Sequence, residues 1–175
     1  MKTSHLLLLG LLTGAPALAD TPTQYLDLRT PAVALTARVT KEGLSSPELQ
    51  LGLTENALRG RAFGQPIDVT LKEDHVGGIY RGGPVNLKLT EEGDTLQAKG
   101  SFGGQITNFK VSPESITGTV GRCSYQLKAA AEKDRYQGTR SCGFGIENPV
   151  NLSIPPAIAA DDARLVATLS IVLAQ

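Results

Sequence analysis

The sequence is poor in the residue types that most often carry chemistry. Its 175 residues include no tryptophan, one methionine, two cysteines and two histidines, and His75 is the one histidine beyond residue 19. A histidine-based catalytic triad and a zinc site of cysteine and histidine ligands both need more such side chains than the chain supplies. His75 lies beside a predicted acidic turn, where we expect a solvent-facing side chain. We therefore predict no catalytic residues, no metal ligands and no cofactor.

The chain also lacks an excess of charge and a long apolar run. Its 17 basic residues balance its 17 acidic residues, which gives no electrostatic case for binding nucleic acid. The run from Leu6 to Leu12 is too short to span a membrane. Following Lys2 and preceding an A-x-A site that ends at Ala19, this run is typical of a secretory signal. The sequence thus predicts a signal peptide over residues 1–19 and a mature chain from Asp20, exported to the periplasm or the cell exterior.

Glycine, in contrast, is abundant and regularly placed. Similar segments recur at a period of about 20 residues, the length of one β-hairpin. The glycines that mark the copies are Gly60, Gly78, Gly100, Gly118 and Gly138. We predict a mainly β fold: an up-and-down antiparallel meander of about 11–12 short strands, curled into a barrel or a strongly bent sheet. A parallel β-solenoid with coils of similar length is the alternative, while the missing tryptophan excludes the GxW signature of lipocalin-type barrels.

Each two-residue turn fixes which side chains face each other across a hairpin. The turns that give apolar cross-strand rows are Glu55-Asn56, Gly64-Gln65, Glu73-Asp74, Gly82-Gly83, Glu92-Gly93, Gly103-Gly104, Pro113-Glu114, Gly121-Arg122 and Glu132-Lys133. This register places three rows of apolar or glycine residues inward, interrupted by Thr107 and Arg140, and sets Leu87 opposite Gly78 and Ala98. The other face is mostly polar, with Ile79 and Ile106 as exceptions.

The chain outside the hairpins divides into three parts. Residues 20–31 are polar and read as a loose lead-in, residues 32–156 form the β-meander domain with a first strand near Val33 to Val39, and residues 157–175 form an apolar C-terminal segment. In that segment, alternating apolar residues favour a strand, whereas Pro156, two aspartates and the alanines favour a helix. We expect a helix whose Leu165, Leu169 and Val172 side packs on the inner face of the sheet.

The two cysteines provide the most specific prediction of a site. Cys123 and Cys142 face each other in the register set by the Glu132-Lys133 turn, so an exported chain should join them in a disulfide. A redox-active pair is the alternative, but the CxxC spacing that lowers a thiol pKa is missing. Neither cysteine lies near the cleavage site, which argues against a lipid anchor.

The turns also separate charge between the two ends of the meander. One end carries Glu55, Glu73, Asp74, Glu91, Glu92, Asp94, Glu114, Glu132 and Asp134. These acids solvate turns and discourage edge association, or bind divalent cations weakly; no DxDxDG spacing supports the second role. The opposite end carries Arg61, Arg81, Arg122 and Arg140, too sparse in the sequence to define a binding patch.

From these patterns we predict an exported, non-enzymatic protein with a structural or envelope-associated role. A carrier that holds an apolar small molecule inside the barrel is the first alternative. An outer-membrane barrel with its apolar rows facing lipid is the second, opposed by short strands, tight turns at both ends and few aromatic residues. A nucleic-acid partner is not expected, and an apolar ligand and an envelope partner remain open.

Overall fold

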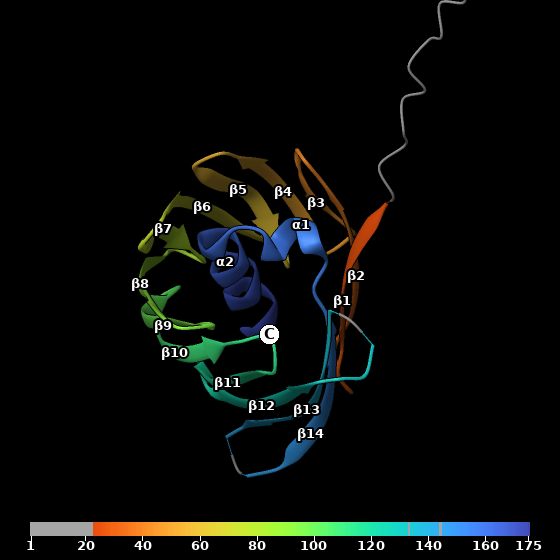
Figure 1. Cartoon of the computed structure of the whole chain (residues 1–175). Helices are drawn as coiled ribbons and strands as arrows, with labels where there is room; N and C mark the ends of the chain where they lie inside the picture. Colours follow the sequence, from red (N-terminus) through yellow and green to blue (C-terminus); the bar gives the residue numbers. More distant parts are fainter. Residues whose placement is uncertain (1–22, 133, 144) are drawn as a thin grey trace, which may run out of the picture.

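The chain folds into one closed barrel of antiparallel strands joined in sequence order. In the computed structural model, residues 23–132, 134–143 and 145–175 are described, so the predicted signal peptide lies outside them. The strands are β1 (Gln24–Arg29), β2 (Ala34–Thr40), β3 (Gly43–Ser45), β4 (Leu49–Thr54), β5 (Ala57–Ala62), β6 (Gln65–Lys72), β7 (His75–Tyr80), β8 (Gly83–Glu92), β9 (Thr95–Phe102), β10 (Gln105–Val111), β11 (Ser115–Val120), β12 (Cys123–Ala129), β13 (Arg135–Cys142) and β14 (Glu147–Ser153). Pairing of β1 with β14 closes the ring (Figure 1). The predicted up-and-down meander is confirmed, with fourteen strands in place of 11–12.

Two strands lie where the sequence indicated irregular chain. The prediction of a loose lead-in over residues 20–31 is wrong for the described part, because β1 pairs with β2 on one side and β14 on the other. The buried inward residues of β1 are Leu26 and Leu28, which are too few to show an alternating pattern. The partner strand β14 is too far away in the sequence to be found from the pattern of a hairpin. The connection before Pro47 contains β3, whose three residues are likewise too short for a periodic signal.

The predicted register holds for six hairpins and is displaced by two residues in three. Leu53 faces Leu58, Leu71 faces Val76, and the four hairpins from β9 to β13 pair as predicted. The pairs β5–β6, β7–β8 and β8–β9 differ, so Leu87 faces Val76 and Gly100 instead of Gly78 and Ala98. A displacement of two residues keeps every side chain on its predicted face, because side chains alternate with a period of two.

The type of primed turn explains all three displacements. The sequence pattern made Gly64 and Gly82 the first residues of their two-residue turns. In the structure they are the second residues, because the turns are Phe63-Gly64 and Arg81-Gly82, with positive φ at both residues, as a type I′ turn requires. The β8–β9 turn instead begins at Gly93, with φ 62°, so that Glu92 remains in the strand. Glycine is favoured at the second position of one turn type and the first of the other, so its presence alone does not fix the register.

The glycines that mark the repeat are points where neighbouring backbones approach closely. At Gly100, φ is 150° and an added Cβ would lie 2.0 Å from the carbonyl oxygen of Asn86 on β8. The same close approach to the preceding strand recurs at Gly60, Gly78, Gly118 and Gly138. Each lies within an odd-numbered strand from β5 to β13. Glycine kinks of this kind let a broad sheet curve into a closed barrel.

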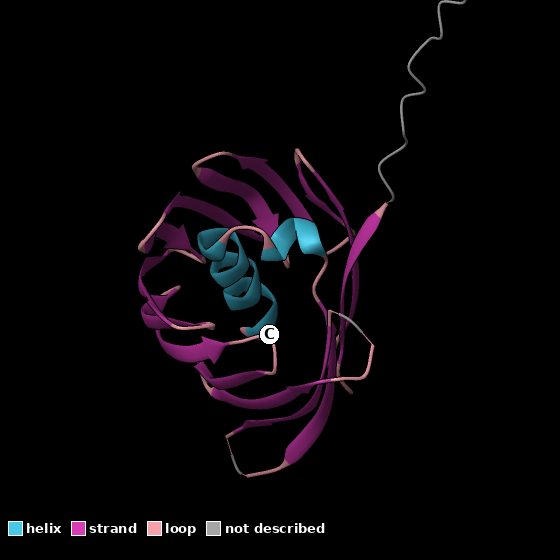
Figure 2. Cartoon of the chain, in the orientation of Figure 1, coloured by secondary structure: helices cyan, strands magenta, loops and turns pink. Residues whose placement is uncertain are grey.

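The C-terminal segment is helical and packs on the inner face of the curled sheet, as predicted. After β14, α1 (Pro156–Ala159) and α2 (Asp162–Leu173) follow, and α2 occupies the space enclosed by the strands (Figures 1 and 2). Ten of the twelve residues of α2 are buried. The predicted contact through one side, Leu165, Leu169 and Val172, therefore extends around the whole helix. This explains why apolar residues recur all around the helix, interrupted by the buried hydroxyl groups of Thr168 and Ser170.

The two faces of the sheet are chemically distinct. Inward side chains from all around the ring are inaccessible to solvent, among them Leu26, Leu58, Leu87 and Ile116. Charged side chains such as Lys88 and Lys99 face outward, and Arg59 pairs with Asp68 on this surface at 2.8 Å. Ile79 and Ile106 are exposed, as predicted. Within the described part of the chain, neither helix has the length and apolar character that a membrane-crossing helix needs.

Replacing Gly100 with alanine should destabilise the barrel. The new Cβ would press on the Asn86 carbonyl, and the positive φ is unfavourable for alanine, so we expect a loss of about 2–4 kcal/mol in the free energy of unfolding. Denaturant unfolding of the oxidised protein measures it. Gly52→Ala is the matched control, because the nearest atom to an added Cβ there is 3.7 Å away. Equal stability of the two variants would contradict the proposed role of the kink.

Candidate functional site

Helix α2 connects the two chemically different ends of the barrel. It begins at the acidic end, where Glu55 and Glu73 lie in hairpin turns and Glu91 at the end of β8. It ends at the glycine-turn end, where the turns carry Gly64, Gly82 and Gly121. At the latter end lies a pocket of about 390 Å³. We call it the arginine pocket. The residues that line it are Arg81, Gln105, Val120, Arg122, Cys123, Arg140, Cys142, Gly143, Ala174 and Gln175.

Two hairpin turns and one strand bring the arginines of this pocket together. Arg81 occupies the β7–β8 turn with φ 53°, and its guanidinium lies 5.0 Å from the centre of the Tyr80 ring. Arg122 follows Gly121 in the β11–β12 turn and is exposed. Arg140 points inward from β13 opposite Tyr125, and only 8% of it is accessible. The barrel thus gathers at one mouth residues that are far apart in the sequence.

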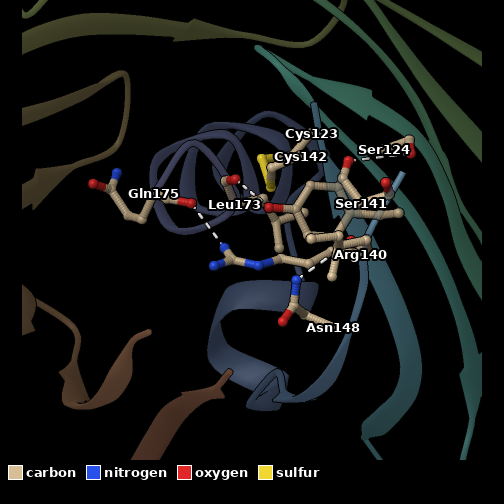
Figure 3. The surroundings of a disulfide bond; sticks show 10 residues. Cys123, Ser124, Arg140, Ser141, Cys142, Asn148, Leu173 and Gln175 are labelled. Carbon is tan, nitrogen blue, oxygen red and sulfur yellow. Dashed lines mark hydrogen bonds between the residues drawn. A yellow bond between two sulfur atoms is a disulfide. The ribbon is translucent and has the colours of Figure 1, made fainter. Parts of the chain in front are cut away.

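The C-terminal end of α2 is held by hydrogen bonds from this rim. The Arg140 Nη1 donates to the Gln175 backbone oxygen at 2.8 Å, a bond drawn in Figure 3. The Arg81 Nη2 donates to the Gln175 Oε1 at 2.5 Å, and the Tyr125 hydroxyl donates to the Leu173 carbonyl. The last carbonyl groups of a helix have no partner within it, and Tyr125 satisfies one of them, while the two arginines hold Gln175 just beyond the helix.

The predicted disulfide borders the same pocket. Cys123 and Cys142 are paired across β12 and β13 and are joined by a disulfide, which confirms the prediction (Figure 3). The bond links the turn that carries Arg122 to the strand that carries Arg140. It therefore fixes the separation of two of the three arginines, in addition to restricting the unfolded chain.

Burial also affects the tyrosine that contacts the helix. It raises the pKa of the Tyr125 hydroxyl, and the neighbouring Arg140 opposes that shift. The hydroxyl therefore remains protonated in the neutral range and can donate to the Leu173 carbonyl.

The acidic end gathers carboxylates around the beginning of α2. Glu55, Glu73 and Glu91 line a second pocket of about 380 Å³ together with Asp161 and Asp162. Asp161 is the N-cap of α2, and its Oδ1 accepts a hydrogen bond of 2.7 Å from the Arg164 backbone nitrogen. The remaining acidic turn residues do not line this pocket. In the described ranges, no group of three or more histidine, cysteine or acidic side chains is arranged to hold a metal ion.

Two carboxylates at this end, those of Glu91 and Asp162, interact with each other. The ability of Asp162 to accept a hydrogen bond from a protonated Glu91, together with the negative charge of Asp162, raises the pKa of Glu91. A protonated Glu91 can donate to a charged Asp162, whereas two charged groups repel each other. The interaction is therefore favourable at low pH and is lost as pH rises through the raised pKa.

The structure places the other predicted residues as follows. His75 is half-buried at the start of β7, with its ring over Gly77 on the outer side of the sheet. Thr107 faces inward and is inaccessible. Arg61 lies on the outer side of β5 and does not line the arginine pocket. Gln105 and Gln175 were not among the predicted site residues, because only the position of α2 inside the barrel reveals their part in the pocket.

Comparisons with protein-family models, with curated proteins and with solved structures find no match to this chain.

Replacing Glu91 with glutamine should stabilise the protein at neutral pH but not at low pH. The amide keeps a donor for Asp162 and removes the repulsion that Glu91 develops once it is charged. The difference in unfolding midpoint from the unsubstituted protein should therefore grow as pH rises through the raised pKa of Glu91. Thermal unfolding across a pH series measures it, with Glu92→Gln as a control at a residue that does not line the pocket with Asp162. A pH-independent difference would contradict this account.

Proposed function

We propose that this protein is an exported, non-enzymatic structural protein, envelope-associated or free, whose barrel is occupied by its own helix. The observation that carries the proposal is the state of the interior. Inward residues on opposite sides of the ring, such as Leu35 and Leu87, have no accessible surface, and neither do Val166, Leu169 and Val172 of α2.

These values argue against a carrier in the conformation described. A binding pocket in general buries about 70% or more of the surface of a small-molecule ligand. A cavity large enough to do so leaves solvent-accessible area on the side chains that line it when no ligand is bound. Here the rows that would form the lining are buried, and α2 packs against β6, β7 and β9. A carrier would have to move the helix out of the barrel before an apolar ligand could enter.

The outer surface supports the same proposal over an outer-membrane barrel. That alternative requires the leucine and valine rows to face lipid and the polar rows to face a lumen. The leucine and valine rows are instead buried on the inner side of the barrel, and Lys88, Lys99, Arg59 and Asp68 are exposed on the outside.

The titratable groups with shifted pKa values support a role without catalysis. Burial raises the pKa of both Tyr125 and Tyr136, and each hydroxyl donates to a backbone carbonyl. A hydrogen bond from Thr40 lowers the pKa of Glu42 at the β2–β3 turn, far along the ring from Glu91 at the end of β8. An active site brings such groups together in one cleft, whereas these serve separate structural contacts.

Shortening one interior side chain of α2 tests whether the helix fills the barrel in solution. We expect Leu169→Ala to lower the free energy of unfolding by about 3 kcal/mol, because it removes a fully buried side chain from a packed core. Ile106→Ala, at a residue that is 77% exposed, should change it by less than about 0.5 kcal/mol. The full chain should also give no saturable fluorescence increase with an apolar dye. A small effect of Leu169→Ala together with saturable dye binding would favour the carrier.

Fractionation of cells that express the full sequence tests the proposed export. We expect the protein in the exported soluble fraction, with the mass of a chain that begins at Asp20. Cys123 and Cys142 should be protected from alkylation until a reductant is added. Recovery only from detergent-extracted outer membrane would overturn the proposal in favour of the membrane barrel. An uncleaved, reduced protein in the cytoplasm would overturn the predicted export.

A further inference from the structure

The outer surface of the barrel carries two adjoining pockets beside the seam where β14 meets β1. One, of about 740 Å³, lies over β11, β12 and β13, and the other, of about 360 Å³, lies over β13, β14 and β1. Gln137 lines both, so together they form one hollow, which we call the outer groove. None of its lining residues belongs to the arginine pocket.

One cross-strand row of outward side chains crosses the groove. From β11 through β12, β13 and β14 to β1, the row reads Ser115, Lys128, Gln137, Asn151 and Arg29. Neighbouring strands lie about 4.8 Å apart, so Lys128 and Arg29 are separated by roughly 14 Å, with two amides between them. The closure of the barrel therefore aligns polar groups that come from both ends of the chain.

The three central side chains of this row are not used to hold the sheet together. Elsewhere on the outer face, polar neighbours bond to each other, as Gln97 does to Asn108 at 3.1 Å. Lys128, Gln137 and Asn151 make no side-chain hydrogen bond or ion pair with the residues that the structure describes, and all three are exposed. Their donors and acceptors are thus available to a ligand at the cost of displacing solvent.

The charge of the groove favours an anionic group at one position. No acidic residue lines the larger pocket, to which Lys128 belongs. In the smaller pocket, Asp27 offsets the charge of Arg29. Arg135 also lines the smaller pocket, and it forms an ion pair with Glu132. The positive charge of Lys128 therefore has no partner of opposite sign within the lining.

The lining argues against an apolar molecule and against an added peptide strand. Tyr125, Leu127 and Leu152 belong to the lining, but they are buried on the inner side of the sheet, so few apolar side chains are exposed in the groove. A peptide that pairs with a sheet needs a free edge, and a closed ring has none.

We propose that the outer groove binds an oligosaccharide that carries an anionic group, a carboxylate or a sulfate. The anionic group contacts Lys128, and sugar hydroxyl groups contact Gln137 and Asn151. Hydroxyl groups and side-chain amides each donate and accept hydrogen bonds, so the two match along the row. A chain of sugars also fits two pockets joined end to end. Such a site lies on the outer surface and is independent of how the barrel interior is filled.

An array of immobilised oligosaccharides tests the proposal with the purified, oxidised protein. It carries uronic-acid oligomers and sulfated oligomers, each beside a neutral oligomer of the same length. We expect binding to at least one acidic class, at least about tenfold stronger than to its neutral counterpart, because a charge-assisted hydrogen bond is added. Preference for uronic acids would identify a carboxylate, and preference for sulfated sugars a sulfate. Absence of binding to every acidic oligomer, or equal binding to the neutral ones, would overturn the proposal.

A matched pair of lysine variants separates a site from general attraction by positive charge. Calorimetric titration with the strongest binder from the array gives the affinity of each. Lys128→Gln should weaken binding about tenfold. Lys88→Gln removes the same charge from the outer side of β8, four strands away, and should leave affinity within about twofold, since salt screens distant exposed charges. Both lysines are exposed, so unfolding midpoints should not change. Equal losses of affinity would overturn the assignment.

A second pair of variants tests the amides in the middle of the row. Gln137→Ala should weaken binding of the same oligosaccharide about fivefold, because hydrogen bonds to sugar hydroxyl groups are lost. Gln50→Ala is the control, since Gln50 is an exposed glutamine on the outer side of β4 and does not line the groove. Unchanged affinity in Gln137→Ala would show that the ligand does not lie in the groove.

Discussion

A closed ring of fourteen strands encloses more space than its own inward side chains can fill. Barrels of about eight strands are just wide enough for side chains to meet at the centre, and wider ones leave a lumen unless another element enters. Here the inward rows are apolar, so an open lumen would expose them to water. Helix α2 removes this surface, and its composition follows from that position: ten of its twelve residues are buried, and eight of these ten are apolar.

The ends of the barrel match the helix that passes between them. The N-terminal end of α2, with its partial positive charge, lies among carboxylates of the strands and turns, Glu55, Glu73 and Glu91. The C-terminal end, with its partial negative charge, lies among Arg81, Arg122 and Arg140. Reversing the helix would place like charges together at both ends. The charges at the turns thus favour one orientation of α2, while apolar packing holds it inside.

Local pattern was sufficient to predict most of the sheet. Alternation assigned each strand from β4 to β13 to its correct face, and the facing positions of Cys123 and Cys142 followed from the same register. The sequence did not distinguish the two primed turn types at Gly64 and Gly82, and the pairing shifted by two residues there. The repeat glycines were recognised as unusual, but their cause, the approach of a neighbouring carbonyl, requires the three-dimensional curvature of the ring.

The candidate site was less accessible to prediction, because it depends on contacts between distant parts of the chain. Arg81, Arg122 and Arg140 were correctly assigned to one end, but their convergence depends on the curvature of the barrel and on the end of α2. The strand β1 was missed for a related reason. It has two inward leucines, and its position depends on β14, which lies more than a hundred residues away in sequence.

The closing pair of β1 with β14 also determines when the molecule can finish folding. Each hairpin joins neighbours in sequence and can form early, because closing a short loop has a small entropy cost. The last seam joins Asp27 to Ser153, so it forms only when nearly the whole chain is present. Until then both edge strands and the apolar inner rows are open to other chains, a state prone to aggregation. A chain that follows this order needs protection from other chains until α2 has entered and the seam has closed.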